Sequence, residues 1–342
     1  MICYRKPGYP TLNAAHLACA RECIVAIVAC GLLVNTAALA QDAATYPAKQ
    51  IRIIVPFPPG GTADILPRVL AEKLSTRFGQ PVLIENRAGA AGNIGAEAVF
   101  KAEPDGYTLL STPPGPFVMN QSLYAKLAFD AAQFVPVTVI ASVPSVLLVH
   151  PKIAANTLQE FIATLRANPD KLNYASQGSG TTSHLTAEML KSMAGVRITH
   201  VPYKGTAPAL TDLLGGQVDM MFDNLGVSAQ HVRSGKLKAL AVSSAKRAAS
   251  LPNVPTVIEA GLPGFVSVAW FGVAAPPKTP PEIAAKLSAA IAEALKHPDV
   301  VKRLQDLSAE PVGNTPAEMA AFMKEEIERW RRVIQSAGVK VD

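Results

Sequence analysis

Cysteine is missing from most of this 342-residue chain. All four cysteines lie near the amino end, at Cys3, Cys19, Cys23 and Cys30. The rest of the chain can form no disulfide and carries no thiolate nucleophile. Metal motifs are missing as well, since neither H-E-x-x-H nor C-x-x-C spacing occurs. About 300 residues can still bury a large core without disulfides, and this length favours two domains.

Concentrated charge is also missing. The 32 Lys and Arg and the 26 Asp and Glu give a net charge of +6, yet no block of five like charges occurs. Basic residues spread in this way are typical of a solvated surface, so binding to nucleic acid is not expected. A mild positive potential can still help to collect small anions.

The apolar stretch at the amino end, Ile24–Leu33, is too short and too lightly anchored for a membrane span. Basic residues precede it and the small residues Ala37–Ala40 follow it, which is the order of a secretory signal peptide. We therefore expect residues 1–40 to be cleaved after about Ala40 and the mature protein to be periplasmic. The alternative is lipidation at Cys30, but only about six apolar residues precede it, fewer than the usual ~7–15.

Beyond the leader, strands and helices alternate at a spacing that predicts a mainly parallel sheet covered on both faces. The expected order is strand Ile51–Phe57, helix Asp64–Phe78, strand Val82–Glu85, helix Ile94–Ala102 and strand Tyr107–Ser111.

The same alternation restarts at Ser145 and predicts a second lobe. Its expected elements are strand Ser145–Val149, a helix from the capping box Thr157–Glu160 to Asn168, strand Leu172–Ser176, helix Thr182–Ala194, strand Ile198–Tyr203, helix Pro208–Leu214, strand Val218–Phe222 and strand Leu237–Val242. Two closing helices, at about 280–296 and 316–337 with N-caps Thr279 and Thr315, should pack back on the first lobe. We assign 41–144 plus 265–342 to lobe 1 and 145–264 to lobe 2.

Two glycine-rich loops occupy equivalent places in the two lobes. Phe57–Asp64 follows the first strand of lobe 1, Ser176–His184 follows a strand of lobe 2, and each leads directly into a helix. Ligands of open α/β sheets sit beyond the carboxyl ends of the strands, where such loops lie. Either loop alone is more often a tight turn, but the pair across two lobes favours a ligand site.

The composition of these loops suits a carboxylate. Glycine lets the backbone approach a ligand, hydroxyls add donors, and the first turn of each helix offers unpaired N–H groups and a partial positive charge. Neither loop contains Lys or Arg, which favours a small, modestly charged anion over a polyphosphate. The predicted ligand contacts are Pro59, Gly60, Gly61, Thr62, Asp64, Ser176, Gly178, Gly180, Thr181, Thr182, Tyr203, Lys204 and Asp223.

The last three of these residues rest on weaker signals. Tyr203 and Lys204 leave a strand and can close over a ligand, although Lys204 also suits a solvated turn. Asp223 and its neighbour Asn224 follow a strand and can accept or donate a hydrogen bond at the cleft. Trp270–Gly272 lies near the expected return crossing, where an aromatic residue is as consistent with the core as with a ligand wall.

Enzyme chemistry is not expected. Ser176 or Ser183 could be combined with His184 and Asp64 as a triad, but no G-x-S-x-G elbow surrounds either serine. The segment Gly89–Gly95 reads G-x-x-G-x-x-G rather than the dinucleotide fingerprint G-x-G-x-x-G. We therefore predict no cofactor and no metal, and we keep an exported hydrolase as a minor alternative.

Several segments resemble the Bug family, the extracytoplasmic solute receptors of tripartite tricarboxylate transporters, and they follow one another in order along the mature chain. They are Pro56–Asp64, Glu85–Gly92, Pro104–Thr108, Tyr174–Gly180, His184–Leu185, Val201–Gly205, Leu213–Asp219 and Val254–Thr256.

The resemblance implies a type II periplasmic-binding-protein fold, in which two lobes joined by a hinge close over a cleft. It also implies that a carboxylate is held between the two loops by backbone groups, hydroxyls and water, and that a monomeric receptor delivers this ligand to a membrane permease. Thr112–Pro116 departs from the family pattern, where polar residues are common, and favours a less polar ligand tail. A ligand sensor that works with a signalling partner, without transport, is the alternative function.

Overall fold

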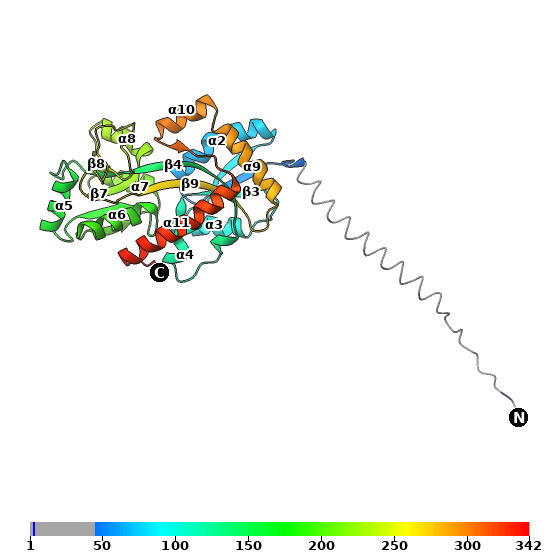
Figure 1. Cartoon of the computed structure of the whole chain (residues 1–342), viewed down its shortest axis with the longest axis horizontal. Coiled ribbons are helices and arrows are strands. Elements are labelled where there is room, and N and C mark those ends of the chain that lie inside the picture. The colour runs from blue at the N-terminus through cyan, green and yellow to red at the C-terminus, as the bar shows by residue number, and fades with distance from the viewer. Residues whose placement is uncertain (1–2, 4–44, 342) are drawn as a thin grey trace. The chain divides into compact units, whose positions relative to one another are not determined.

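The computed structural model of the chain describes residue 3 and residues 45–341 (Figure 1). The predicted signal peptide and its cleavage site, apart from Cys3, lie outside the described residues. Within the described part, no helix is long and apolar enough to cross a membrane. From Pro47 onward the chain folds as one unit.

The first half of this unit is built on three parallel strands. Strand β1 (Ile51–Val55) lies between β2 (Val82–Asn86) and β3 (Thr108–Thr112) and pairs in parallel with both. Helices α2 (Thr62–Phe78) and α3 (Asn93–Phe100) connect them. These elements confirm the predicted ones to within two residues at each end.

The second half repeats the plan. Strand β5 pairs in parallel with β6 and β7, and helices follow each strand; the elements are α5 (Leu158–Ala167), β5 (Asn173–Ser176), α6 (Thr182–Ala194), β6 (Thr199–Pro202), α7 (Thr206–Leu214), β7 (Met220–Asn224), α8 (Leu225–Arg233) and β8 (Lys238–Val242). Residues of α5 and α6 share one core with Tyr174, while residues of α7 and α8 share another with Ala175. Adjacent residues of β5 thus face opposite layers.

Two long strands join the halves through the middle of the sheet (Figure 1). Strand β4 (Val135–Val149) pairs with β9 (Val268–Ala275) up to Pro144. Beyond this point it pairs with β7 from Ser145 onward and with β8 from Val146 onward. All these pairings are antiparallel, so the expected parallel pattern holds only for the outer strands. The sequence predicted the second part of β4 alone, because prolines at positions 136 and 144 argue against a strand.

The closing segment returns to the first lobe. It contains α9 (Pro281–Ala294), α10 (Pro298–Asp306), β10 (Glu310–Pro311) and α11 (Pro316–Ala337); the remaining short elements are η1 (Ala90–Gly92), η2 (Gly115–Met119), α4 (Asn120–Leu123) and η3 (Ala131–Gln133). The capping box of Thr315 and Glu318 is confirmed. The predicted N-cap Thr279 is wrong: Pro280 occupies that position, and the Thr279 hydroxyl donates to the Pro276 carbonyl at 2.8 Å.

The cores follow the two-lobed plan. One cluster lies in the first lobe around Phe117, Trp270 and Trp330, and two clusters cover the faces of the second lobe. Leu185 of α6 is an exception, because it belongs to the second lobe by sequence but is fully buried in the first lobe's cluster. The predicted α/β fold with two lobes is confirmed.

Candidate functional site

Two small adjoining cavities lie between the lobes, where β1, β3, β5 and β7 end. Their volumes are about 20 and 10 Å³, and they share the walls Phe57, Pro113, Gln177, Asn224 and Phe271. Among the described residues that line them, none carries a charged side chain. An anion held here would therefore rely on backbone dipoles, hydroxyls and amides.

Four helices begin at these cavities. Thr62 and Thr182 are the first residues of α2 and α6, Thr206 is the first residue of α7, and Asn224 is the N-cap of α8. Each helix start carries unpaired N–H groups and a partial positive charge. Their convergence from both lobes creates an anion-binding environment without a cationic side chain.

Two hydroxyls at this point are buried and unpaired. Thr62 Oγ1 and Thr182 Oγ1 have no hydrogen-bond partner among the described residues, although the two residues are only 1% and 6% exposed. Thr112 Oγ1 is unpaired in the same way and directly precedes the cavity residue Pro113. A buried polar group left unpaired costs about 1–3 kcal/mol, so these hydroxyls are ready to donate to an acceptor in the cavity.

Asp64, a predicted ligand contact, lies beneath the first loop and lines neither cavity. Its carboxylate accepts hydrogen bonds from the Gly60 N–H at 3.0 Å, from Arg68 Nε at 2.9 Å and from Asn86 Nδ2 at 2.8 Å. Burial raises the pKa of Asp64, but the hydrogen bonds from Arg68, Asn86 and Gly60 outweigh burial and hold the pKa below its usual value. The ionised carboxylate thus fixes the loop from below.

Of the other predicted residues of the first loop, two line a cavity and two do not. Gly61 lines the larger cavity together with Thr62, and a Cβ at Gly61 would lie 3.3 Å from Thr206 Oγ1 of the second lobe. Pro59 and Gly60 are exposed and line neither cavity. The lobes therefore approach closely at Gly61, where even a methyl group would press against Thr206.

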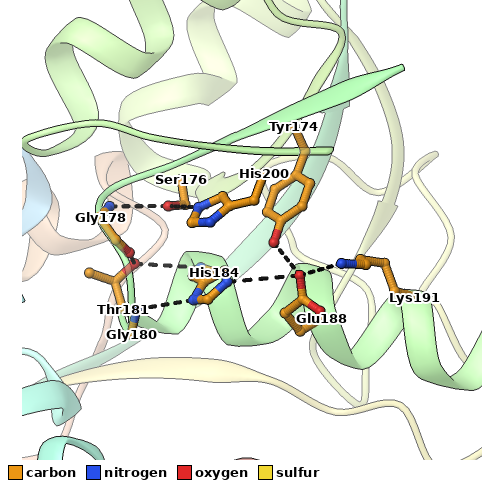
Figure 2. Close-up of polar contacts among 9 residues, drawn as sticks. All are labelled: Tyr174, Ser176, Gly178, Gly180, Thr181, His184, Glu188, Lys191 and His200. Atoms are coloured by element: carbon orange, nitrogen blue, oxygen red, sulfur yellow. Dashed lines mark hydrogen bonds and ion pairs between the residues drawn. The ribbon is translucent and has the colours of Figure 1, made fainter. Parts of the chain in front are cut away.

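In the second loop, Thr181 and Thr182 line the smaller cavity. Thr181 is the N-cap of α6, and its hydroxyl donates to the Gly178 carbonyl at 2.7 Å. Ser176 is fully buried and turns toward His200, while the Gly180 N–H points at His184 (Figure 2). Sequence reasoning missed His200, which lies on the neighbouring strand β6.

Asp223 also lies behind the site rather than in it. It is 1% exposed and accepts hydrogen bonds from Gln177 Nε2 at 2.8 Å and from the Ser228 hydroxyl. Burial raises the pKa of this carboxyl to about 6, against the lowering effect of these hydrogen bonds. Asp223 therefore orients Gln177, a wall of both cavities that the sequence did not single out.

An outer groove of about 480 Å³ adjoins the cavities at Phe57 and Gln177. Tyr203 and Lys204, which were predicted as ligand contacts, line this groove and neither inner cavity. The Tyr203 hydroxyl donates to Asp212 at 2.6 Å, and burial together with this hydrogen bond and the Asp212 charge raises the pKa of Tyr203 to about 12. Lys204 is exposed and forms no ion pair with any residue that the structure describes.

The triad considered in the sequence is not assembled. Ser183 Oγ donates to the Phe222 carbonyl at 2.6 Å, and Asp64 is engaged in the other lobe. A different pair, Ser176 Oγ and His200 Nε2, lies 2.7 Å apart, but Ser176 is fully buried and lines none of the cleft cavities. A nucleophile in this place has no access to a substrate.

Comparison with known proteins agrees with this architecture. The sequence matches the family described as "Tripartite tricarboxylate transporter family receptor" over residues 66–339. Protein BugT of Bordetella pertussis is 41% identical over 315 residues, which cover 91% of this chain and 97% of that protein.

Two solved structures are similar throughout. "R. palustris Rpa4515 with adipate" is 40% identical with a TM-score of 0.84, over 86% of this chain and 99% of that one. "MatC (Rpa3494) from Rhodopseudomonas palustris with bound malate" is 38% identical with a TM-score of 0.81, over 84% and 100%. The resemblance to the Bug family is confirmed, and the chain belongs to the receptor family of tripartite tricarboxylate transporters, a family of extracytoplasmic solute-binding receptors.

Proposed function

We propose that this protein is a periplasmic receptor that binds a small organic carboxylate between its lobes and delivers it to a membrane permease, without chemical turnover. The observation that carries the proposal is the pair of buried, unpaired hydroxyls of Thr62 and Thr182 at equivalent helix starts in the two lobes. One carboxylate can accept from both hydroxyls and from the adjacent N–H groups.

Two relatives support the chemical class of the ligand. The structures similar to this chain contain adipate and malate, both of which are carboxylates. Phe57, Phe271 and Pro113 give the cavities apolar walls. We propose that one carboxylate meets the helix starts and that a less polar tail meets these walls.

Binding requires the lobes to separate and close again. Cavities of about 20 and 10 Å³ have room for about one water molecule each, which is too little for an organic acid. We place the hinge where β4 changes partners, between Pro144 and Ser145, with 41–144 plus 265–342 as lobe 1 and 145–264 as lobe 2. Partner exchange along β4 supports this boundary.

A thermal-shift panel of organic acids tests the proposal on the mature protein. A cognate acid in large excess over its Kd should raise Tm, because a ligand that binds only the folded state adds RT ln(1 + [L]/Kd) to stability. Mass spectrometry of the acid after incubation should show no product, and size-exclusion chromatography with light scattering should show a monomer. No stabilisation by any acid would refute the proposal, and turnover would revive the hydrolase alternative.

A further inference from the structure

The backbone of the loop Ser176–Thr181 is held by few backbone hydrogen bonds: the Thr181 N–H donates to the Gly178 carbonyl at 3.2 Å, and the Tyr203 N–H donates to the Ser176 carbonyl at 3.0 Å. Gly178 and Gly180 adopt φ values of 133° and 83°, in the left-handed region that favours glycine. The Gly178 N–H donates to Ser176 Oγ at 3.2 Å, and the Gly178 carbonyl accepts from the Thr181 hydroxyl. Side chains outside the loop add further support.

Two histidines provide that support, one at each end (Figure 2). His200 Nε2 lies 2.7 Å from Ser176 Oγ, and His184 Nδ1 accepts the Gly180 N–H at 3.0 Å. The two imidazoles stack with centroids 4.0 Å apart and planes 9° apart, and the Tyr174 ring stacks with His200 at 4.7 Å. The stack locks both rings in place.

The protonation of His184 follows from its partner. Because Nδ1 accepts the Gly180 N–H, the ring proton must sit on Nε2, which faces Glu188 Oε1 at 3.8 Å. Glu188 also accepts from the Tyr174 hydroxyl and from Lys191 at 2.7 Å. Burial, with the nearby Lys191 charge, lowers the pKa of His184 to about 4, so the ring is neutral near pH 7 and keeps its acceptor.

Neither histidine lines the cavities between the lobes. Both line a separate cavity of about 420 Å³ behind the loop, together with Ser179 and residues 337–341. Their contact with the ligand site is therefore indirect, through Ser176 and Gly180. Both residues come before Thr181 and Thr182, which line the smaller cavity at the start of α6.

We propose that His184 and His200 are positioning residues, which fix the Ser176–Thr181 loop so that the start of α6 points its donors into the inter-lobe cavity. The link to ligand binding rests on the proposed function, whereas the effect on the loop does not. Loss of either imidazole then loosens one end of the loop and weakens ligand binding, even in a protein that remains folded.

Backbone amide exchange measured by NMR on glycine-labelled protein tests this without a ligand. His184→Leu should accelerate exchange at Gly180 by roughly five- to tenfold, the loss expected for one hydrogen bond, and His200→Leu should do so at Gly178. His184→Asn and His200→Gln each retain an acceptor near the lost nitrogen and should largely restore protection. The matched control is His150→Leu, because His150 Nδ1 also accepts a backbone N–H, that of Lys152 at 3.2 Å, away from the cleft.

A second arm measures affinity by calorimetry with adipate and malate as probes. The leucine variants should bind about tenfold more weakly than wild type, the Asn and Gln variants nearly as well, and His150→Leu as well as wild type. Unchanged exchange at both glycines, equal acceleration throughout the second lobe, or altered exchange with unaltered affinity would each overturn the proposal. If wild type binds neither probe, that counts against the proposed function, and the exchange arm alone decides the role of the histidines.

Discussion

The backbones of Gly226 and Leu307 touch across the two lobes, and a Cβ built at Gly226 would lie 2.0 Å from the Leu307 carbonyl oxygen. Gly226 is in the first turn of α8, and Leu307 directly follows α10. Beside this contact, Ser250 Oγ and Ser308 Oγ lie 2.6 Å apart. The two backbones can lie this close only because residue 226 has no side chain, so this arrangement of the lobes depends on the glycine.

Gly226→Ala should hold the lobes apart. The added methyl group collides with backbone, which cannot rotate away, so the described arrangement loses population to more open ones. Small-angle scattering without ligand should give a larger radius of gyration than for wild type. Gly215→Ala is the control, since its Cβ meets only ordinary contacts, the nearest at 3.4 Å; equal dimensions in both variants would contradict the prediction.

Thr62→Val and Thr182→Val should separate binding from stability. Valine matches the shape of threonine but lacks the unpaired hydroxyl, so Tm without ligand should stay equal or rise. A hydrogen bond to a charged group contributes ~1.5–3 kcal/mol, so each variant should bind a carboxylate about 10–100-fold more weakly. Calorimetry and thermal denaturation provide the two readouts.

Thr186→Val is the matched control in the same helix. Its hydroxyl donates to the Thr182 carbonyl at 2.7 Å and pairs with Ser267, so its loss should lower stability by about 1 kcal/mol. Affinity should change little. If Thr62→Val and Thr182→Val instead lose stability and keep their affinity, the two hydroxyls serve the fold and not the ligand.

Asp223 should make stability depend on pH. Its pKa is raised from 3.8 to about 6 in the folded protein, so its contribution to stability is fully present below about pH 4 and is lost as pH rises through about 6. Asp223→Asn removes the buried charge. Relative to this variant, the free energy of unfolding of wild type should fall by up to about 3 kcal/mol between about pH 4 and pH 7. Urea denaturation across this range measures the difference, and parallel curves would contradict it.

Lys204→Ala should leave equilibrium affinity nearly unchanged. Lys204 is exposed, lines only the outer groove and is absent from the walls of the inner cavities. Its charge can still steer an anion, so the association rate should fall modestly and the effect should shrink in salt. Stopped-flow fluorescence measures the rate; a tenfold loss of affinity would move the carboxylate site to the groove.

Local signals in the sequence were sufficient for the two loops and the helices that follow them. At both Thr62 and Thr182, glycines and hydroxyl residues lie next to a change from a strand pattern to a helix pattern. Because these signals are neighbours in the chain, the local sequence is enough to predict both loops. The first part of β4 was missed because Pro136 and Pro144 argue against a strand. In the structure, Pro136 lies beside a register shift between β4 and β9, and Pro144 lies where β4 changes partner.

The roles of buried side chains were beyond reach of the sequence. Asp64 and Asp223 looked like ligand contacts, but their partners Asn86 and Gln177 lie 22 and 46 residues away in the chain. His200 reaches Ser176 only because β6 pairs with β5. Sequence placed the acidic residues near the site, whereas only the packed fold reveals that they support the loops from behind.

A crystal structure of the mature protein with the acid that gives the largest thermal shift is the most direct test of the central claim. We predict one carboxylate between the lobes, with its oxygens within hydrogen-bond distance of Thr62 Oγ1 and Thr182 Oγ1 and no cationic side chain in contact. A ligand seated only in the outer groove, with both hydroxyls still unpaired, would contradict it.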